Sequence, residues 1–175
     1  VLVRSNNDAN AIIKSLNVKN IPWHFSGGSG LYSREEVRIL ISFLKTISDL
    51  SDNVSLFHLA SSEIYKIPMQ DLTVCMNEAS RTKISLYRIF TQFSRLNDLT
   101  DLGKQVIQKI IDDLKKYIET SRELSAGQVL YKFINETGWL KKLADEKTAS
   151  SVEKVSNIAI FFDIIKNFSD KLSHW

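Results

Sequence analysis

The sequence predicts an α+β fold that is mainly α-helical, in which a short strand-helix-strand-helix segment is followed by a set of helices. Two observations predict this class. Apolar, β-rich pieces occur only within the first fifty residues, where they alternate with helical patterns as in an α/β layer. From about Asp49 onward, apolar residues recur at a spacing of three and four, which indicates helices. We therefore expect two regions, residues 1–50 and residues 51–175.

Composition restricts the class of protein. Of the 175 residues, 43% are hydrophobic and 25% are charged, which is typical of a soluble globular chain with a core. The single cysteine, Cys75, excludes an internal disulfide and favours a reducing, cytoplasmic compartment. No apolar run reaches the roughly 18 residues of a membrane span, so we expect no membrane partner. The net charge of +3 permits a polyanionic partner without requiring one. A start without methionine and an abrupt end indicate an excised fragment.

The first region begins with two predicted strands. Residues 1–5 are apolar and β-rich, and the polar residues after them supply caps for a helix that extends through Leu16. Residues 21–25 predict a second short strand. The partner strands of both are expected to lie outside this chain.

The glycine-rich stretch at residues 26–30 raises the question of a phosphate-binding loop. No Lys-Ser/Thr pair follows it, and Ser33 stands where the dinucleotide fingerprint requires its third glycine. The stretch predicts instead a turn into a helix that is capped by Ser33 and Glu36. The expected apolar stripe of that helix is Val37, Leu40, Ile41, Leu44 and Ile47.

The second region is predicted to be helical throughout. Ser125 with Gln128, and Ser150 with Glu153, form capping boxes that start two helices. Gly138 suits the left-handed position that ends the first of them. The longest apolar face is expected to carry Val106, Ile107, Ile110, Ile111, Leu114, Tyr117 and Ile118. The buried face of the last helix is expected to carry Val155, Ile158, Phe162 and Ile165.

Residue types indicate no catalytic set and no metal site. The histidines are scattered and lack cysteines or paired carboxylates at ligand spacing; they are His24, His58 and His174. Asp112 and Asp113 point in two directions around a helix, as on a solvated face. Cys75 is typical of a small core residue rather than a nucleophile.

A basic and aromatic stretch at residues 81–95 permits two interpretations. Cations beside stacking aromatics are the chemistry that holds single-stranded nucleic acid. At helical spacing, however, Leu86, Phe90 and Phe93 form a core stripe with a solvated basic flank. We favour the core interpretation.

Two parts of the sequence resemble the UvrD/Rep/PcrA family of ATP-dependent DNA helicases. "VLVRSNNDANAIIKSL" at 1–16 and "IPWHFSGGSGLYSREEVRILISFLKTI" at 21–47 match a strand-end motif and a loop-to-helix motif of the second motor domain. "NETGWLKKLADEKTASSVEKVSNIAIFFDIIKNF" at 135–168 looks like the end of the inserted subdomain 2B. The middle matches only as generic helix. The resemblance implies that residues 1–50 belong to the second RecA-like domain, 2A, and residues 51–175 to 2B.

The resemblance also implies which residues of the first region engage DNA. Arg4, Ser5 and Asn6 occupy the strand-end motif. Tyr32 and Arg34 occupy the loop-to-helix motif, which in this family faces single-stranded DNA or braces the motor. The family's Gln and Arg in the strand-end motif are replaced by Asp8 and Asn10, a departure from its phosphate-sensing or bracing pattern.

One nucleic-acid position is implied in the second region. The family's Gly-Ile-Gly turn, which approaches duplex backbone, falls on Lys66, Ile67 and Pro68. Without glycines the backbone approaches less closely, while Lys66 supplies a charge for phosphate.

The expected function is therefore that of a fragment of an ATP-dependent DNA helicase of DNA repair or replication. It contributes DNA engagement and regulation, with single-stranded and junction DNA and the rest of the motor as partners. The Walker motifs are absent, so the fragment is expected to hold no cofactor, and ATP and magnesium belong to the parent. Two alternatives stay open: a recombination-type helicase–nuclease subunit, and a stand-alone helical interaction module whose motif match is accidental.

Overall fold

The computed structural model describes residues 12, 15–16, 19, 21 and 30–172, with side chains up to residue 166. It contains two compact units, Val1–Arg34 and Glu35–Trp175. In the first unit, residues 12, 15 and 16 are helical, and Leu31–Ser33 form a 3-10 turn, η1. The predicted strand at 1–5 and most of the one at 21–25 lie outside the described residues, and Ile21 is in no strand.

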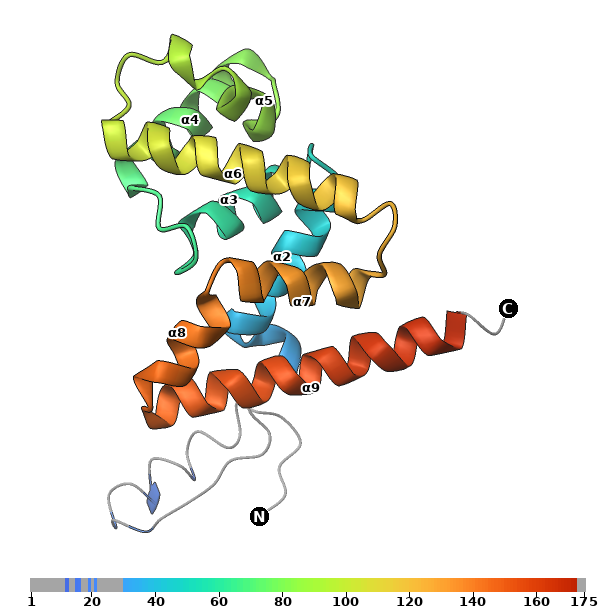
Figure 1. The fold of residues 1–175 in the computed structure, drawn as a ribbon. Helices are drawn as coiled ribbons and strands as arrows, with labels where there is room; N and C mark the ends of the chain where they lie inside the picture. Colours follow the sequence, from blue (N-terminus) through green and yellow to red (C-terminus); the bar gives the residue numbers. More distant parts are fainter. Residues whose placement is uncertain (1–11, 13–14, 17–18, 20, 22–29, 173–175) are drawn as a thin grey trace. The chain divides into compact units, whose positions relative to one another are not determined.

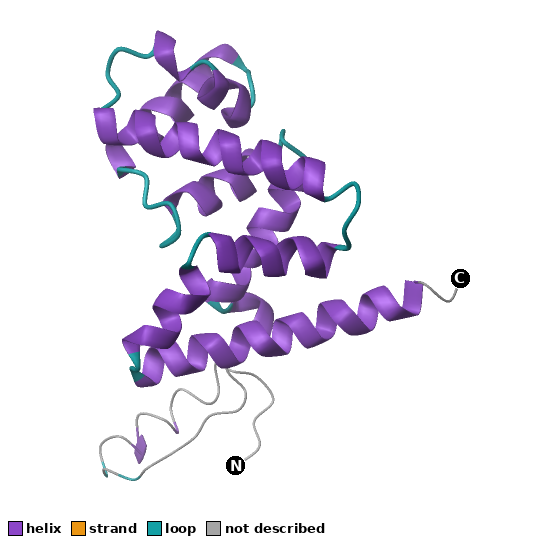
Figure 2. Cartoon of the chain, in the orientation of Figure 1, coloured by secondary structure: helices purple, strands orange, loops and turns teal. Residues whose placement is uncertain are grey.

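The second unit is built from helices joined by short loops (Figures 1 and 2). In chain order they are α2 (Glu35–Ser48), α3 (Asn53–Ser61), α4 (Met69–Thr82), α5 (Leu86–Thr91), η2 (Phe93–Arg95), α6 (Asp101–Thr120), α7 (Ala126–Glu136), α8 (Trp139–Glu146) and α9 (Ala149–Leu172). The mainly helical prediction is confirmed. The strand part of the predicted α+β class has no support, since the described residues contain no strand. None of the described helices is both long and apolar enough to cross a membrane.

Most predicted helix boundaries follow from local capping. The capping box of Ser125 and Gln128 starts α7, and Gly138 ends that helix at a φ of 70°, as predicted. The box predicted at Ser150 is wrong. Thr148 Oγ1 instead accepts from the Ser151 amide, and Ser151 Oγ accepts from the Thr148 amide, both at 3.0 Å. The helix therefore begins two residues earlier than predicted.

The start of α2 also differs from the prediction. Ser33 lies in η1, where its hydroxyl donates to the Gly30 carbonyl at 2.7 Å, and α2 begins at Glu35. Of the predicted stripe of α2, Val37 and Leu40 are buried and the other three residues are half-buried. Ile39 and Phe43 are buried as well, so the buried face is rotated from the predicted stripe.

Three aromatic rings form the centre of the core. Phe43 of α2 stacks on Phe133 of α7, with ring centroids 3.8 Å apart and planes 9° from parallel. Tyr117 of α6 meets both rings edge-on, at 5.4 and 5.5 Å. Its hydroxyl leaves the apolar cluster and donates to Glu136 Oε2 at 2.8 Å. These contacts hold α2, α6 and α7 together, and the edge-on arrangement is the one that aromatic quadrupoles favour.

Helix α2 contacts several other helices of the second unit. It packs on α3, α6, α7 and α9, and Figure 1 shows it running from α9 past α7 towards α6. Near its start the buried side chain of Glu36 accepts a 2.6 Å hydrogen bond from Asn157 Nδ2 of α9. The helix predicted within residues 1–50 therefore belongs to the second compact unit. The functional division into residues 1–50 and 51–175 stays a prediction.

A buried carboxylate organises the start of α6. Asp71 of α4 is fully buried, and it accepts from the Thr100 amide at 2.8 Å and from the Thr100 hydroxyl at 2.6 Å. The hydroxyl of Thr100 in turn accepts from the Gly103 amide at 3.0 Å. The space beside Gly103 is filled by Asp71, whose carboxylate a Cβ at that position would overlap. Position 103 thus requires glycine because Asp71 lies so close to it that there is no room for a side chain.

Candidate nucleic-acid interface

The turn between α3 and α4 carries the predicted contact residue Lys66. Its φ is 52°, which is the left-handed region that glycine adopts most readily. The turn is closed by two backbone hydrogen bonds, from the Lys66 amide to the Ser62 carbonyl at 2.8 Å and from the Ile67 amide to the Ala60 carbonyl at 3.2 Å. Ile67 is buried, whereas Lys66 is exposed. Lys66 therefore has the backbone conformation typical of glycine, and its exposed side chain adds a positive charge to the turn.

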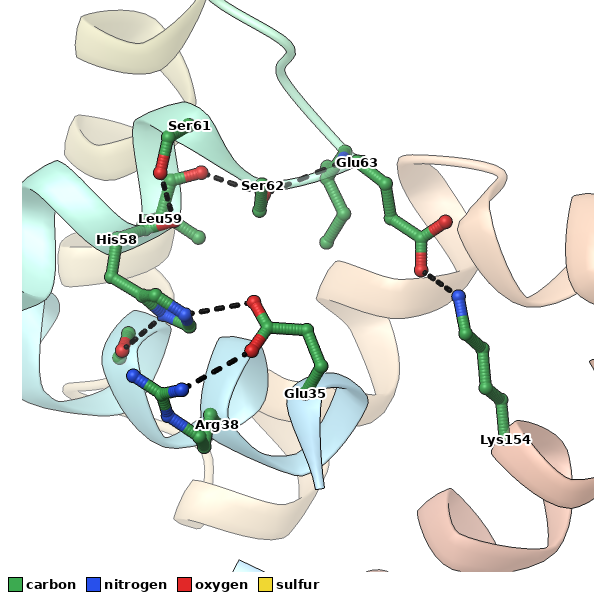
Figure 3. Close-up of polar contacts among 10 residues, drawn as sticks. Glu35, Arg38, His58, Leu59, Ser61, Ser62, Glu63 and Lys154 are labelled. Atoms are coloured by element: carbon green, nitrogen blue, oxygen red, sulfur yellow. Dashed lines mark hydrogen bonds and ion pairs between the residues drawn. The ribbon is translucent and has the colours of Figure 1, made fainter. Parts of the chain in front are cut away.

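Two side chains of this turn reach helices that are distant in the sequence. Glu63 Oε1 lies 2.9 Å from Lys154 Nζ of α9, an ion pair that Figure 3 shows beside the end of α3. Tyr65 donates its hydroxyl hydrogen to Asp113 Oδ2 of α6 at 2.9 Å. Burial raises the pKa of Tyr65, and the neighbouring Asp113 raises it further. The raised pKa favours the protonated hydroxyl, which is the form that donates to Asp113.

Helix α6 adds a second cation beside the turn. Lys109 Nζ lies 5.9 Å from the centre of the Tyr65 ring and 2.9 Å from Asp113 Oδ2. A cation over an aromatic face is attracted by the ring's electron density. Lys109 is exposed and is paired with Asp113, so this side of the turn carries an ion pair at the surface.

A polar cluster at the start of α2 braces α3, the helix that leads into the turn (Figure 3). His58 of α3 lies between two side chains of α2, with Nε2 2.9 Å from Glu35 Oε1 and Nδ1 3.0 Å from Ser42 Oγ. Arg38 adds an ion pair to Glu35 at 3.4 Å. Ser42 lies inside α2, and its contact with His58 joins the middle of α2 to α3. The order Ser-His-Glu is therefore a structural bridge between helices.

The remaining predicted site residues lie in the first unit. Tyr32 is the middle residue of η1, and its side chain is 59% exposed. Arg34 ends η1 in an extended conformation, with its amide donating to the Leu31 carbonyl at 3.1 Å. Arg4, Ser5 and Asn6 lie outside the described residues. Lys66 belongs to the second unit.

Two interpretations of residue type are confirmed. In the stretch 81–95, Leu86 and Phe90 are fully buried and Phe93 is half-buried, whereas the basic residues are exposed. Cys75 is buried, and this burial raises the pKa of its thiol to about 12, which suppresses the reactive thiolate. In the part of the chain that the structure describes, no group of three metal-ligating side chains comes together.

The cluster around His58 and the ion pair of Glu63 are the features that sequence reasoning missed. His58 was interpreted only as a scattered histidine, because Glu35 and Ser42 are 23 and 16 residues away from it. Glu63 and Lys154 are 91 residues apart. No spacing pattern within one helix signals contacts of this kind.

Comparison with known proteins places the chain in a family. The family model described as "UvrD-like helicase C-terminal domain" matches residues 1–174. The chain is 22% identical over 178 residues to a protein of Staphylococcus epidermidis strain RP62A, and 21% identical over 173 residues to one of Staphylococcus aureus strain Mu50. Each is named ATP-dependent DNA helicase PcrA. The matches cover 97% of this chain but only 23% of either relative.

A match over nearly the whole chain also removes the alternative of an accidental motif in an unrelated helical module. The family model matches almost the entire chain, whose described part is mainly helical. The chain belongs to the family of UvrD-like helicase C-terminal domains.

Proposed function

We propose that this chain is the DNA-engaging and regulatory part of an ATP-dependent DNA helicase of DNA repair or replication. The family match over residues 1–174 and the similarity to the two PcrA helicases support this proposal. Residues 1–50 are proposed to form part of the 2A motor domain, and residues 51–175 to form the 2B subdomain. The partners are single-stranded and junction DNA together with the rest of the motor.

The observation that carries the DNA-engaging role is the turn at Lys66. A turn tip with a φ of 52° projects its exposed side chain away from the core that Ile67 anchors. A lysine ammonium at such a tip meets a phosphate as a point charge, without base readout. Contact through phosphate is independent of sequence, as a protein that moves along DNA requires. Tyr32 and Arg34 are proposed to contact single-stranded DNA from the first unit, together with Arg4, Ser5 and Asn6.

ATP and magnesium are assigned to the rest of the helicase. The 175 residues contain no glycine loop followed by the Lys-Ser/Thr pair that holds phosphate and magnesium. The chain alone is therefore proposed to hydrolyse no ATP. Phosphate release by the purified chain above a buffer blank would contradict this assignment. The helicase–nuclease alternative is tested by the parent sequence, in which it requires a nuclease domain.

The test of DNA engagement is the salt dependence of binding to a labelled duplex with a single-stranded tail. Lys66→Ala removes one phosphate contact, so the slope of log K against log salt should fall by about 0.9 and affinity at 0.1 M salt by about eightfold. Lys83→Ala is the matched control. Lys83 is also exposed, has a φ of 58°, and ends the 14-residue helix α4 that starts beside Lys66, about 20 Å away. Equal effects of the two substitutions would overturn the assignment of Lys66.

A further inference from the structure

We propose that helix α9 holds the turn at Lys66 in its DNA-binding conformation through the ion pair of Glu63 and Lys154. This inference rests on the proposed function, and it adds a mechanism that sets the geometry of the same site. Glu63 and Lys154 are positioning residues, because they act through Lys66 rather than on DNA.

The geometry places the pair where it can act on the turn. Glu63 lies two residues after the end of α3 and three residues before Lys66. Its partner Lys154 lies in the second turn of α9, and the two side chains meet at 2.9 Å. Both side chains are largely shielded, at 25% and 30% exposure, so solvent screens the pair less than an open surface pair. Figure 3 shows Glu63 extending from the end of α3 towards α9.

The turn needs such external contacts because its conformation is unfavourable by itself. A residue with a side chain is strained in the left-handed region, and Lys66 has no glycine-like freedom there. Two side chains that flank Lys66 tie the segment to the rest of the unit, Glu63 to α9 and Tyr65 to α6. Loss of either tie lets the segment between Ser62 and Pro68 relax towards less strained conformations.

Removal of the negative charge of Glu63 distinguishes a positioning role of this residue from a purely electrostatic effect on DNA binding. Glu63 is an acid near a proposed phosphate contact, and Glu63→Gln raises the net charge from +3 to +4. Electrostatics alone predicts tighter DNA binding by this variant, because a repulsive charge is gone. Positioning predicts weaker binding, because Lys66 loses its fixed presentation. Glu136→Gln is the matched control, since Glu136 forms a 2.7 Å ion pair with Lys116 between α6 and α7 and the charge change is identical.

The experiment measures binding of the tailed duplex by the 175-residue chain and its variants at 0.1 M salt. Glu63→Gln and Lys154→Met should each weaken binding about fivefold, the equivalent of one left-handed residue's strain. The charge swap Glu63→Lys with Lys154→Glu should restore affinity to within about twofold, and Glu136→Gln should bind at least as tightly as the wild type. Amide hydrogen exchange at Ile67, which donates to Ala60, should speed up in both single variants.

Three outcomes are decisive against the inference. If Glu63→Gln binds as tightly as wild type or more tightly while Lys66→Ala weakens binding, positioning by α9 is overturned and the proposed function stands. If Lys66→Ala has no effect, the proposed function fails and the inference fails with it. Unchanged exchange at Ile67 in both single variants would likewise overturn the role of the pair.

Discussion

Substitution of Gly103 by alanine should destabilise the second unit, against the usual effect of this change in a helix. In an unconstrained helix, Gly→Ala is favourable by about 1 kcal/mol. Here the new methyl group would overlap the carboxylate of Asp71. Overpacking costs about 1–3 kcal/mol, and displacement of Asp71 weakens its two hydrogen bonds to Thr100, each worth about 1.5–3 kcal/mol if fully lost. We expect a net loss of about 2–4 kcal/mol.

Urea unfolding followed by circular dichroism measures this loss, with an unchanged m-value as evidence of two-state behaviour. A double-mutant cycle identifies the cause. Asp71→Ala removes the carboxylate that the new methyl group meets, so Gly103→Ala should cost at least about 1 kcal/mol less in that background. A stabilising Gly103→Ala, or a cycle that is additive within about 0.5 kcal/mol, would refute the reasoning.

Three further predictions concern stability. Phe133→Ala removes the ring stacked on Phe43 and should lower the free energy of unfolding by about 3–5 kcal/mol in urea; a loss below about 1 kcal/mol would contradict a central role for the stack. Lys83→Gly relieves a φ of 58° at the end of α4 and should raise the free energy of unfolding by about 1 kcal/mol, which raises the melting temperature. A lower melting temperature would count against strain at this residue. Hydrogen bonds from Ser55 lower the pKa of Asp52 below 3.8, so this cap stabilises the fold above pH 4 and is lost as the pH falls through the lowered pKa. Asp52→Asn should flatten that acid decline in a pH titration of stability, and an unaltered decline would exclude Asp52 as a contributor.

The sequence was sufficient for the buried face of α6, where one helix contains the whole signal. Ile107, Ile110 and Leu114 are buried on α6 as predicted, because a face at three-and-four spacing has only one way to meet a core. The start of α9 was misplaced because the segment from Thr148 to Ser151 offers several side chains that can cap. Only the packed structure selects among them.

The position of the candidate site stays a prediction, and its backbone conformation could not be predicted from the sequence. The resemblance pointed to Lys66, yet a sequence without glycine gave no reason to expect a left-handed turn there. In our proposal that conformation is held by the contacts of Glu63 and Tyr65 with side chains that are 91 and 48 residues away in the sequence. Such contacts arise from tertiary packing, which overrides the local preference of each residue. The same holds for His58, whose partners lie on another helix.

The central place of α2 has a consequence for the order in which the unit folds. This helix is among the first parts of the unit to be synthesised, yet its buried Glu36 receives its hydrogen bond from Asn157, 121 residues later. Contacts of such sequence separation form late, because a long loop must close first. Until α9 has been made, the Glu36 carboxylate can be hydrogen-bonded only by water or by other groups. Burial of this end of α2 as the structure shows it therefore requires the last helix of the unit.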